Sequence, residues 1–460
     1  MIEGAVVWPA ERSLRSWLAL LARGDAIGEV RSAIEPDQAL GAVLQEADGL
    51  RAVLFTHVAG ADCPVVGNLV TDRAQLALAM GCDVGGVAER FLTALERPVP
   101  WQEVSAGDAP VLTHRMTGRR LLSTLPLAVQ HEHDAGRYVT AALLCVRDPA
   151  TGATNLSINR MLAVGERELR VLLLPGRLRR IFDEAEAQGR ALEVGIAVGV
   201  DPLLTLASQA PADQDLDDLA VAGALYGAPL NAVRAPTVDA VVPAEAEFLL
   251  EGRFRVGERA PEGPFGEFPL TYGAGGDAPI IDLVAAWHRP DPVFQTILSG
   301  GREHFYAGGI PREAELLRGL RRCDVRVADV RMTEAGSCRF HAVLSLRDPT
   351  PGAAVRALLT VFSVNPVIKH VIVVNDDVDV FANEQVGWAV ATRVQADRDV
   401  LIIPGAGGSS IDPSAPDGIG AKMGIDATVS AGDRERHAKV RTPTPDGGLL
   451  ARYFAEAGLA

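Results

Sequence analysis

The chain has 460 residues, 48% of them hydrophobic and 22% charged, which is enough for two or three domains with sizeable cores. Its formal net charge of −15 argues against sequence-independent nucleic-acid binding, because that binding relies on lysine and arginine contacts to phosphate. No charge-free apolar stretch reaches the roughly 18 residues of a membrane span, and the first residues lack the basic and then apolar pattern of a signal peptide. Five scattered cysteines without a C-x-x-C pair support neither a disulfide framework nor a cysteine zinc site. We therefore expect a cytoplasmic protein that binds neither nucleic acid nor a membrane.

The first hundred residues predict a small α/β domain. Apolar residues in 12–23 recur at the i, i+3, i+4, i+7 spacing of an amphipathic helix. Helix, strand and helix patterns follow, at residues 41–47, 51–58 and 72–81. Prolines near residue 100 mark a boundary. We therefore place an N-terminal α/β domain at residues 1–104.

Residues 105–305 predict a β-rich second domain. Short apolar runs alternate there with turn signals, at residues 138–146, 156–164, 168–176, 192–200, 248–256 and 280–288. Several short strands at this spacing favour a β-barrel or a sandwich. One helix, at residues 177–189, interrupts the strands and closes on a glycine, which suits a helix C-terminus.

Residues 306–460 return to an alternation of strands and helices. Helices are predicted at residues 311–322, 352–362 and 383–395, and strands at residues 342–346, 370–374 and 399–405. This alternation is typical of a second α/β domain. A terminal helix is predicted at residues 447–458, where it could dock on a neighbouring chain.

The stretch PEGPFGEF, residues 261–268, places Glu262 and Glu267 around a proline and two glycines. This spacing lets both side chains point into one concavity. Two carboxyl groups close together in a poorly solvated site cannot both ionise easily, which leaves one carboxylate and one carboxylic acid at neutral pH. Such a pair is suited to delivering a proton to carbon. The alternative is a solvated surface turn with two unrelated acids.

Other polar stretches are open to more than one interpretation. A turn rich in Asp, Pro and Gly leads into a predicted strand, on which Asn155 and Ser157 share a face and Arg160 lies on the other unless the strand bends. The alternative is a hairpin with a surface arginine. His131 and His133 have strand spacing, but no third metal ligand is identifiable nearby. The stretch PGAGGSSID, at residues 404–412, lacks the lysine and the spacing of a phosphate-binding P-loop, so a loop after a strand is expected there.

Taken together, these segments resemble the UbiD family of decarboxylases, which use prenylated FMN. Four stretches carry the resemblance in order: RDPATGATNLSINR, VGIAVGVDPLLTLAS, TVDAVVPAEAEFLLEG and RAPEGPFGEFPLTYG. The EGPFGE block is the most specific of them, and the resemblance extends over most of the chain. It implies a central FMN-binding split β-barrel at residues 105–305. An N-terminal α/β domain and a C-terminal α/β oligomerisation domain, at residues 306–460, would flank that barrel.

In this family an arginine and two glutamates form the catalytic network, and the motifs carry these roles to Arg160, Glu262 and Glu267. An arginine keeps its proton in a protein, so it can hold a substrate carboxylate and keep one glutamate ionised. The second glutamate can then donate the proton that replaces CO2. Loss of CO2 from an sp2 carbon leaves a carbanion that needs a cofactor as electron sink. The resemblance therefore implies a non-oxidative, reversible carboxy-lyase acting on a small aromatic, heteroaromatic or α,β-unsaturated carboxylic acid.

The family also binds the flavin phosphate through a divalent metal, such as manganese, held by Asn, His and Glu. Asn155 and Glu247 match the first and third ligands, whereas Arg177 stands where the histidine is expected. Arginine has no lone pair to give a metal and carries its own positive charge. Either Arg177 replaces the charge of the metal, pairing with the phosphate or with Glu247, or the flavin site is lost. In the second case the protein would be a flavin-independent decarboxylase of an activated acid or a non-catalytic scaffold. The flavin-binding residues that the resemblance implies are Asn155, Ser157, Ile158, Asn159, Arg160, Gly176, Arg177 and Glu247.

The stretch ILSGGREHFYAGGIPREAELLRGLRR looks most like the branch of the family that includes furan-dicarboxylate and pyrrole-2-carboxylate decarboxylases. By this resemblance, Arg302 and His304 would line the substrate pocket and bind a second polar or anionic group. The alternative is that they hold a loop. The family also implies a flavin prenyltransferase as cofactor supplier and a homodimer or higher homo-oligomer.

Overall fold

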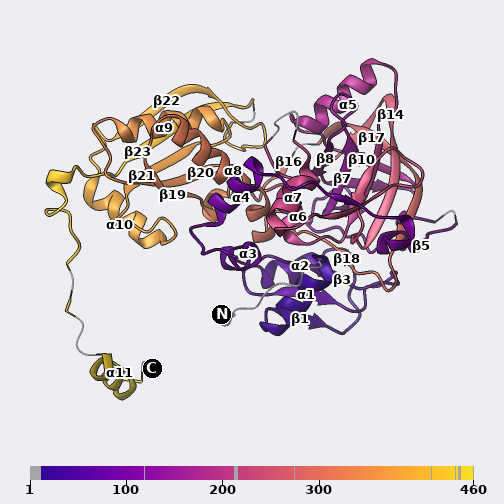
Figure 1. Ribbon diagram of the computed structural model, residues 1–460, viewed down its shortest axis with the longest axis horizontal. Coiled ribbons are helices and arrows are strands. Elements are labelled where there is room, and N and C mark those ends of the chain that lie inside the picture. The colour runs from indigo at the N-terminus through magenta and orange to yellow at the C-terminus, as the bar shows by residue number, and fades with distance from the viewer. Residues whose placement is uncertain are drawn as a thin grey trace.

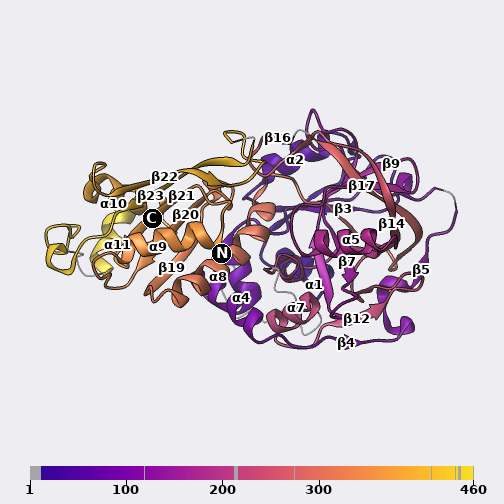
Figure 2. The same ribbon diagram turned by 90° about the horizontal axis from the view of Figure 1, so that it is seen from above.

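The computed structural model of the protein describes residues 12–118, 120–211, 216–273, 275–415, 417–440, 442–443 and 447–458. Helices and strands are mixed along this part of the chain, and they gather around three main sheets (Figure 1). The N-terminal sheet, in indigo, lies next to the large central sheet, while the C-terminal sheet, in orange and yellow, lies on the other side of the molecule. Helices α4 (Val87–Glu96) and α8 (Arg302–Arg322) stand between the central and C-terminal sheets in both views (Figures 1 and 2).

The N-terminal region begins with the predicted amphipathic helix, α1 (Leu14–Arg23). Ser13 starts it with a capping box, because its hydroxyl accepts a hydrogen bond from the Ser16 amide and the Ser16 hydroxyl accepts one from the Ser13 amide. The apolar face of the helix buries Trp17. The sheet beside it has the strand order β1 (Ile27–Val30), β2 (Ala52–Phe55), β3 (Val65–Gly67), β18 (Phe294–Gln295), with α2 (Ala39–Ala47) and α3 (Arg73–Met80) in the same region.

Two connections tie the N-terminal region to the central one. Strand β18 comes from residues after the central strands, yet it pairs in parallel with β3 of the first sheet. Leu40, Leu44 and Phe55 of the N-terminal region share one buried apolar cluster with Phe248 and Phe294. These two regions therefore have a common core.

The central sheet has nine strands, most of them antiparallel neighbours. Its strand order is β6 (Tyr138–Val139), β9 (Met161–Val164), β10 (Glu168–Val171), β17 (Gly276–His288), β14 (Phe248–Glu262), β11 (Glu193–Val198), β7 (Ala142–Arg147), β8 (Thr154–Ile158), with β5 (His114–Arg115) also paired to β17. Helices α5 (Arg177–Ala187), α6 (Pro202–Ala207) and α7 (Asp218–Tyr226) accompany it. Two small sheets complete the region: β13 (Val241–Pro243), β12 (Asn231–Arg234), β4 (Gln102–Glu103), and β15 (Phe265–Gly266), β16 (Tyr272–Gly273).

The C-terminal region is a five-stranded sheet with helices. The strand order is β19 (Val327–Met332), β20 (His341–Leu346), β21 (His370–Asn375), β23 (Ile419–Asp426), β22 (Val400–Gly407), and the helices are α9 (Ala353–Val364), α10 (Asn383–Arg393) and the terminal α11 (Gly447–Glu456). In Figure 1, α11 lies apart from this sheet. No helix among the described residues is long and apolar enough to cross a membrane.

Helix α8 is longer than the sequence pattern predicts. The expected helix began at Pro311, whereas the structure begins it at Arg302 and keeps the proline inside it. The buried Glu313 of α8 pairs with Arg73 of α3 at 2.6 Å, and it also accepts a hydrogen bond from the Met332 amide at 2.8 Å. These contacts connect α8 to the N-terminal region and to the C-terminal sheet.

Candidate active site

The three residues of the expected catalytic network meet in the structure. Arg160 lies between β8 and β9, where the chain bends, and its Nε and Nη2 donate to Oε1 and Oε2 of Glu262, each at 3.0 Å. The remaining nitrogen, Nη1, pairs with Glu267. The side chains of Arg160, Glu262 and Glu267 are 10%, 0% and 9% exposed. One buried guanidinium therefore bridges two carboxylates, so the PEGPFGEF stretch is not a solvated surface turn.

The loop that carries the two glutamates has a backbone that needs glycine. Strand β14 ends at Glu262, and the next residue, Gly263, has a φ of +86°. A Cβ at this position would lie 2.6 Å from the Cα of Gly275, just before β17, so only glycine fits there. The hairpin of β15 and β16 then turns the chain back, and the Glu267 amide donates to the Thr271 carbonyl at 2.9 Å. The loop thus fixes both carboxylates relative to Arg160.

Aromatic side chains surround the arginine. Its guanidinium carbon lies 4.9 Å from the centre of the Phe265 ring, a cation–π arrangement. The Phe265 ring in turn lies 4.5 Å from that of Tyr138 on β6. Burial, and then the neighbouring Glu262, raise the pKa of Tyr138, so its phenol keeps its proton at neutral pH. This part of the site is sheltered from water.

Arg160 and Glu267 line a cavity of about 240 Å³ between the central sheet, α8 and the C-terminal region. The hydroxyl of Ser299, also on its wall, is buried and has no hydrogen-bond partner among the described residues. Apolar, aromatic and polar side chains form the remaining wall, among them Ile158, Leu172, Leu174, Phe265, Phe268, Val367, Ser409 and Ile411. The loop expected at residues 404–412 begins only after β22 (Val400–Gly407), and its residues Ser409 and Ile411 contribute to the cavity.

One side of the cavity carries two arginines that the sequence did not single out, the half-buried Arg312 and the buried Arg339. Arg312 of α8 and Arg339 both line it, and in the described part of the chain neither forms an ion pair with a carboxylate. Burial lowers the pKa of Arg312 and of Arg339, and the positive charge of Arg312 lowers that of Arg339 further. A Cβ on Gly308 would lie 1.7 Å from Arg339 Nη2, so the glycine leaves room for this guanidinium. Both guanidinium groups donate to backbone carbonyls, Arg312 to Gly308 and Arg339 to Phe305 and Cys338. Two cations held this way at one wall suit an anionic ligand.

His304 lies on the same wall as the two arginines, whereas Arg302 does not line the cavity. The Arg302 side chain is 43% exposed, and its Nε lies 3.9 Å from Asp48. Residues two apart on a helix point to different sides, which explains the separation. Arg312 lies about 80° around the helix from His304 and about 80° from Arg302 on the other side, so helical spacing does not single it out. Nothing in the sequence alone pointed to Arg312 or to Arg339.

The half-buried His304 should make the protein sensitive to acid. Burial, then the nearby Arg339 and Arg312, lower the pKa of His304 to about 3. Because the unfolded chain binds this proton at its ordinary pKa of about 6.5, stability is lost as the pH falls below that value towards the folded pKa. The variant His304→Gln should therefore lose less stability from pH 7 to pH 5 in urea unfolding, by up to about 1.4 kcal/mol per pH unit. The exposed His57→Gln is the control, and equal losses in all three proteins would contradict this expectation.

The residues expected at the metal site lie in two separate clusters of contacts. Asn155 and Arg177 both contact Asp218, at the start of α7, and burial raises the pKa of Asp218 to about 6 despite the arginine. Glu247 pairs with Arg15 rather than with Arg177. The described residues contain no group of three or more His, Cys, Asp or Glu side chains that could hold a metal ion.

His131, which the sequence offered as a possible metal ligand, lies against the backbone of the catalytic loop, since a Cβ on Gly266 would reach its ring.

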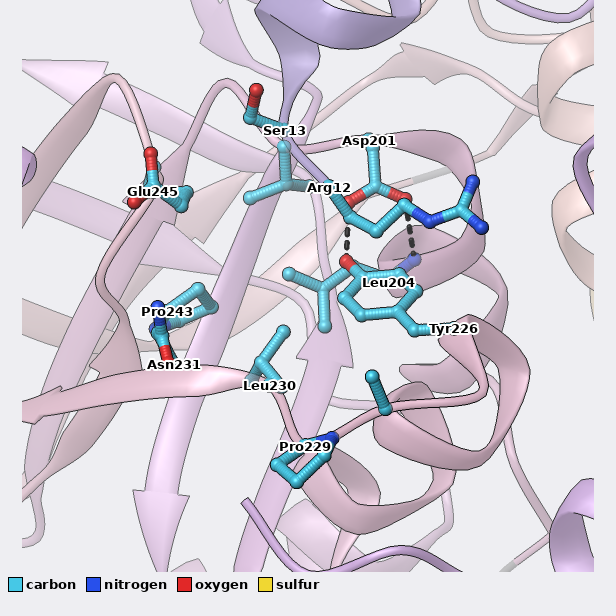
Figure 3. A pocket seen from close by; sticks show the side chains of 13 residues that line it. Arg12, Ser13, Asp201, Leu204, Tyr226, Pro229, Leu230, Asn231, Pro243 and Glu245 are labelled. Atoms are coloured by element: carbon cyan, nitrogen blue, oxygen red, sulfur yellow. Dashed lines mark hydrogen bonds between the residues drawn. The ribbon is translucent and has the colours of Figure 1, made fainter. Parts of the chain in front are cut away.

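A second, smaller cavity of about 60 Å³ lies at the junction of the N-terminal segment with α6 and α7 (Figure 3). Asp201 stands on its wall, where it caps α6 through the Leu204 amide and accepts a hydrogen bond from the Tyr226 hydroxyl. Arg12 and Glu245 also line it. This volume is too small for a substrate with a cofactor, so we assign the cavity no catalytic role.

Comparison with known proteins agrees with this geometry. Residues 18–95, 102–302 and 305–427 match the N-terminal, Rift-related and C-terminal domains of 3-octaprenyl-4-hydroxybenzoate carboxy-lyase. The chain therefore belongs to the UbiD family of carboxy-lyases and has the three-domain fold of that class.

Individual relatives are similar over most of the chain. Anhydromevalonate phosphate decarboxylase of Methanothermobacter thermautotrophicus is 37% identical over 389 residues, 84% of this chain and 90% of its own. The structure of the UbiD-class enzyme HmfF of Pelotomaculum thermopropionicum in complex with FMN has a TM-score of 0.93 and 42% identity, and covers 96% of this chain and 100% of its own. An evolved dimeric form of HmfF in complex with prFMN has a TM-score of 0.88 and 40% identity, with the same coverage.

Proposed function

We propose that this UbiD-family protein is a prenylated-FMN-dependent decarboxylase of a small acid that carries a second anionic group. The observation that carries the proposal is the single guanidinium of Arg160, which bridges Glu262 and Glu267 at the wall of a sheltered cavity. The flavin part is supported by the HmfF structures, which hold FMN or prFMN. The apolar wall of Ile158 and Leu172 and the unpaired hydroxyl of Ser299 suit a flavin as well.

The contacts of Arg160 suggest how the proton is delivered. Its Nε and Nη2 are committed to Glu262, so a substrate carboxylate can reach only Nη1, where Glu267 now sits. A carboxylate displaced from a guanidinium and left beside a second carboxylate takes up a proton more readily. Glu267 would then hold a proton next to the carbon that loses CO2, and transfer of that proton to the carbon would leave Glu267 ionised. Bound prenylated FMN would supply the electron sink for the carbanion.

The substrate class follows from Arg312 and Arg339. A buried cation without a counter-charge is costly, and an anionic group bound between two of them offsets that cost. The substrate would therefore present one carboxylate to Arg160 and a second anion to this pair. A dicarboxylic acid, as in the furan-dicarboxylate branch, and an acid with a phosphate group, as in anhydromevalonate phosphate, both provide such an anion.

Substitution of the two arginines tests this substrate class. Arg312→Gln and Arg339→Gln should each lower kcat/KM by about 30-fold or more for furan-2,5-dicarboxylate or anhydromevalonate phosphate, whichever the protein accepts. The loss should be much smaller for furan-2-carboxylate, which lacks the second anion. The exposed Arg321→Gln, on the same helix and paired with Glu89, is the matched control. Equal losses for acids with and without a second anion would overturn the proposal.

Further features belong to the same proposal. The nine-stranded sheet would form the flavin-binding split barrel, with Asn155, Ser157, Asn159 and Gly176 among the residues that hold the cofactor. The boundaries at residues 104 and 305 would separate the three domains. A flavin prenyltransferase would supply the cofactor, and the protein would act in the cytoplasm as a homodimer or a higher homo-oligomer. The evolved dimeric form of HmfF supports an assembly of this kind.

A further inference from the structure

The glutamate that the family resemblance gives to a metal is already occupied in this chain. The Glu247 side chain is 0% exposed, and both of its oxygens bind Arg15: Nε donates to Oε1 at 2.9 Å and Nη2 to Oε2 at 3.0 Å. The Val293 amide also donates to Oε2, at 3.0 Å. Arg289 Nη1 lies 3.6 Å from Oε1 and bridges to Glu245, on the edge of the cavity in Figure 3. Glu247 therefore already faces a bidentate guanidinium, whose positive charge opposes the approach of a metal ion.

The position expected for the histidine ligand is likewise part of an ion pair. Arg177 Nη2 pairs with Asp218, and Nη1 donates to the Leu216 carbonyl at 2.6 Å. The same carboxylate oxygen of Asp218 accepts the Asn155 side-chain amide at 3.1 Å and the Leu156 amide at 2.7 Å. Asn155 is therefore oriented by the partner of Arg177, with its Oδ1 buried and without a hydrogen-bond partner among the described residues.

These residues do not fit a divalent metal. A guanidinium keeps its proton and offers no lone pair, so neither Arg15 nor Arg177 can serve as a ligand. Of the three expected ligands, only the Asn155 oxygen is left available. The charges nevertheless balance: two guanidinium ions bring the same charge as one divalent cation, and they stand opposite the two carboxylates of Glu247 and Asp218. Two ion pairs thus stand where the resemblance expects a metal ion.

We propose that this chain holds its flavin without a divalent metal at the positions of Asn155, Arg177 and Glu247, where two arginine–carboxylate pairs stand instead. The inference rests on the proposed function for the presence of a flavin, and it goes beyond that function in how the flavin is held. Because a chelator removes only metal ions and leaves these ion pairs in place, flavin affinity should be insensitive to chelators.

Measuring flavin binding and metal content in the unaltered protein tests whether the flavin is held without a metal, and it needs no assay of activity. FMN is titrated against the purified protein by flavin fluorescence, after treatment with EDTA and again after addition of Mn²⁺, and bound metal is measured by inductively coupled plasma mass spectrometry. We expect less than about a twofold change in the FMN dissociation constant and no stoichiometric metal. One tightly bound metal per chain, or a loss of affinity of about tenfold or more that Mn²⁺ restores, would overturn the inference. Absence of FMN binding under every condition would instead count against the proposed function itself, because no flavin would be held.

Restoring a ligand set gives a second, independent test. The double variant Arg15→Gln/Arg177→His removes both arginines and returns the histidine, so it should gain one Mn²⁺ per chain and bind FMN about tenfold more tightly with Mn²⁺ than with EDTA. Arg179→His is the matched control, because Arg179 is exposed on the same helix and pairs only with Asp183 among the described residues. A double variant that folds, as judged by circular dichroism, but gains no manganese would contradict the assignment of these positions. If the double variant does not fold, the measurements on the unaltered protein decide.

Discussion

Replacing Glu267 by glutamine is expected to lower the rate of CO2 release by about 10²–10⁴-fold, the usual contribution of a positioned general acid. The glutamine keeps the size of the side chain but cannot give a proton to carbon. Glu267 is the member of the network that both contacts Arg160 and lines the cavity, so it is placed to reach a bound substrate. The measurement is single-turnover CO2 release by protein loaded with prenylated FMN, together with deuterium incorporation at the product carbon in D2O.

The control for this variant is Glu258→Gln, on the preceding strand β14, whose side chain is 63% exposed and pairs with Arg255. It should release CO2 at the unaltered rate. Both variants should fold and bind FMN, because Arg160 keeps its two hydrogen bonds to Glu262 when Glu267 becomes glutamine. Full activity of Glu267→Gln would remove the role of proton donor from this residue.

Replacing Arg160 by glutamine should affect both activity and stability. The variant leaves the carboxylates of Glu262 and Glu267 buried without their shared counter-charge, and breaking a buried ion pair from one side costs about 3–5 kcal/mol. It also removes the group that would hold the substrate carboxylate, so CO2 release should fall by at least about 10²-fold. Urea unfolding measures the first effect and single-turnover kinetics the second.

A double variant separates these two effects. Adding Glu262→Gln to Arg160→Gln removes one of the unpaired charges, so stability should return towards that of the unaltered protein while activity stays lost. Arg170→Gln, on the neighbouring β10 and paired with Glu168, provides a control for loss of a partly exposed arginine. Unchanged stability in the single variant, or activity regained in the double variant, would show that Arg160 does not hold the network together.

Helices and strands that bury only one face could be predicted from the sequence, because their apolar residues recur with a regular period. Helix α1 shows the amphipathic spacing, and the structure forms it as expected. Helix α7 was not predicted, because every residue from Asp218 to Leu225 is buried and an element buried on all sides has no periodic pattern. The start of α8 was missed because Gly308, Gly309 and Pro311 are unusual inside a helix. There the glycines make room for Arg339 and Cys338 from the C-terminal region, a tertiary reason that a local pattern does not contain.

The residues of the candidate site could likewise be predicted only in part from the sequence. Spacing alone favoured a surface turn for Glu262 and Glu267, because their partner Arg160 lies about a hundred positions earlier in the chain, and only the family motifs joined the three. Arg302 was expected at the substrate but lies outside the cavity, since the geometry of a helix separates it from His304. The partners of Glu247 and Arg177, which are Arg15 and Asp218, come from distant segments and have no motif that marks them.

The most direct test of the account is an NMR measurement in D2O on protein made together with a flavin prenyltransferase. The protein is given furan-2,5-dicarboxylate and, separately, anhydromevalonate phosphate, and the product carbon is observed. The account predicts CO2 release from one of these acids with a single deuterium at the carbon that lost it, only when prenylated FMN is bound and not with Glu267→Gln. CO2 release by flavin-free protein would show a flavin-independent decarboxylase instead. No reaction of either acid with fully loaded protein would contradict the proposed substrate class.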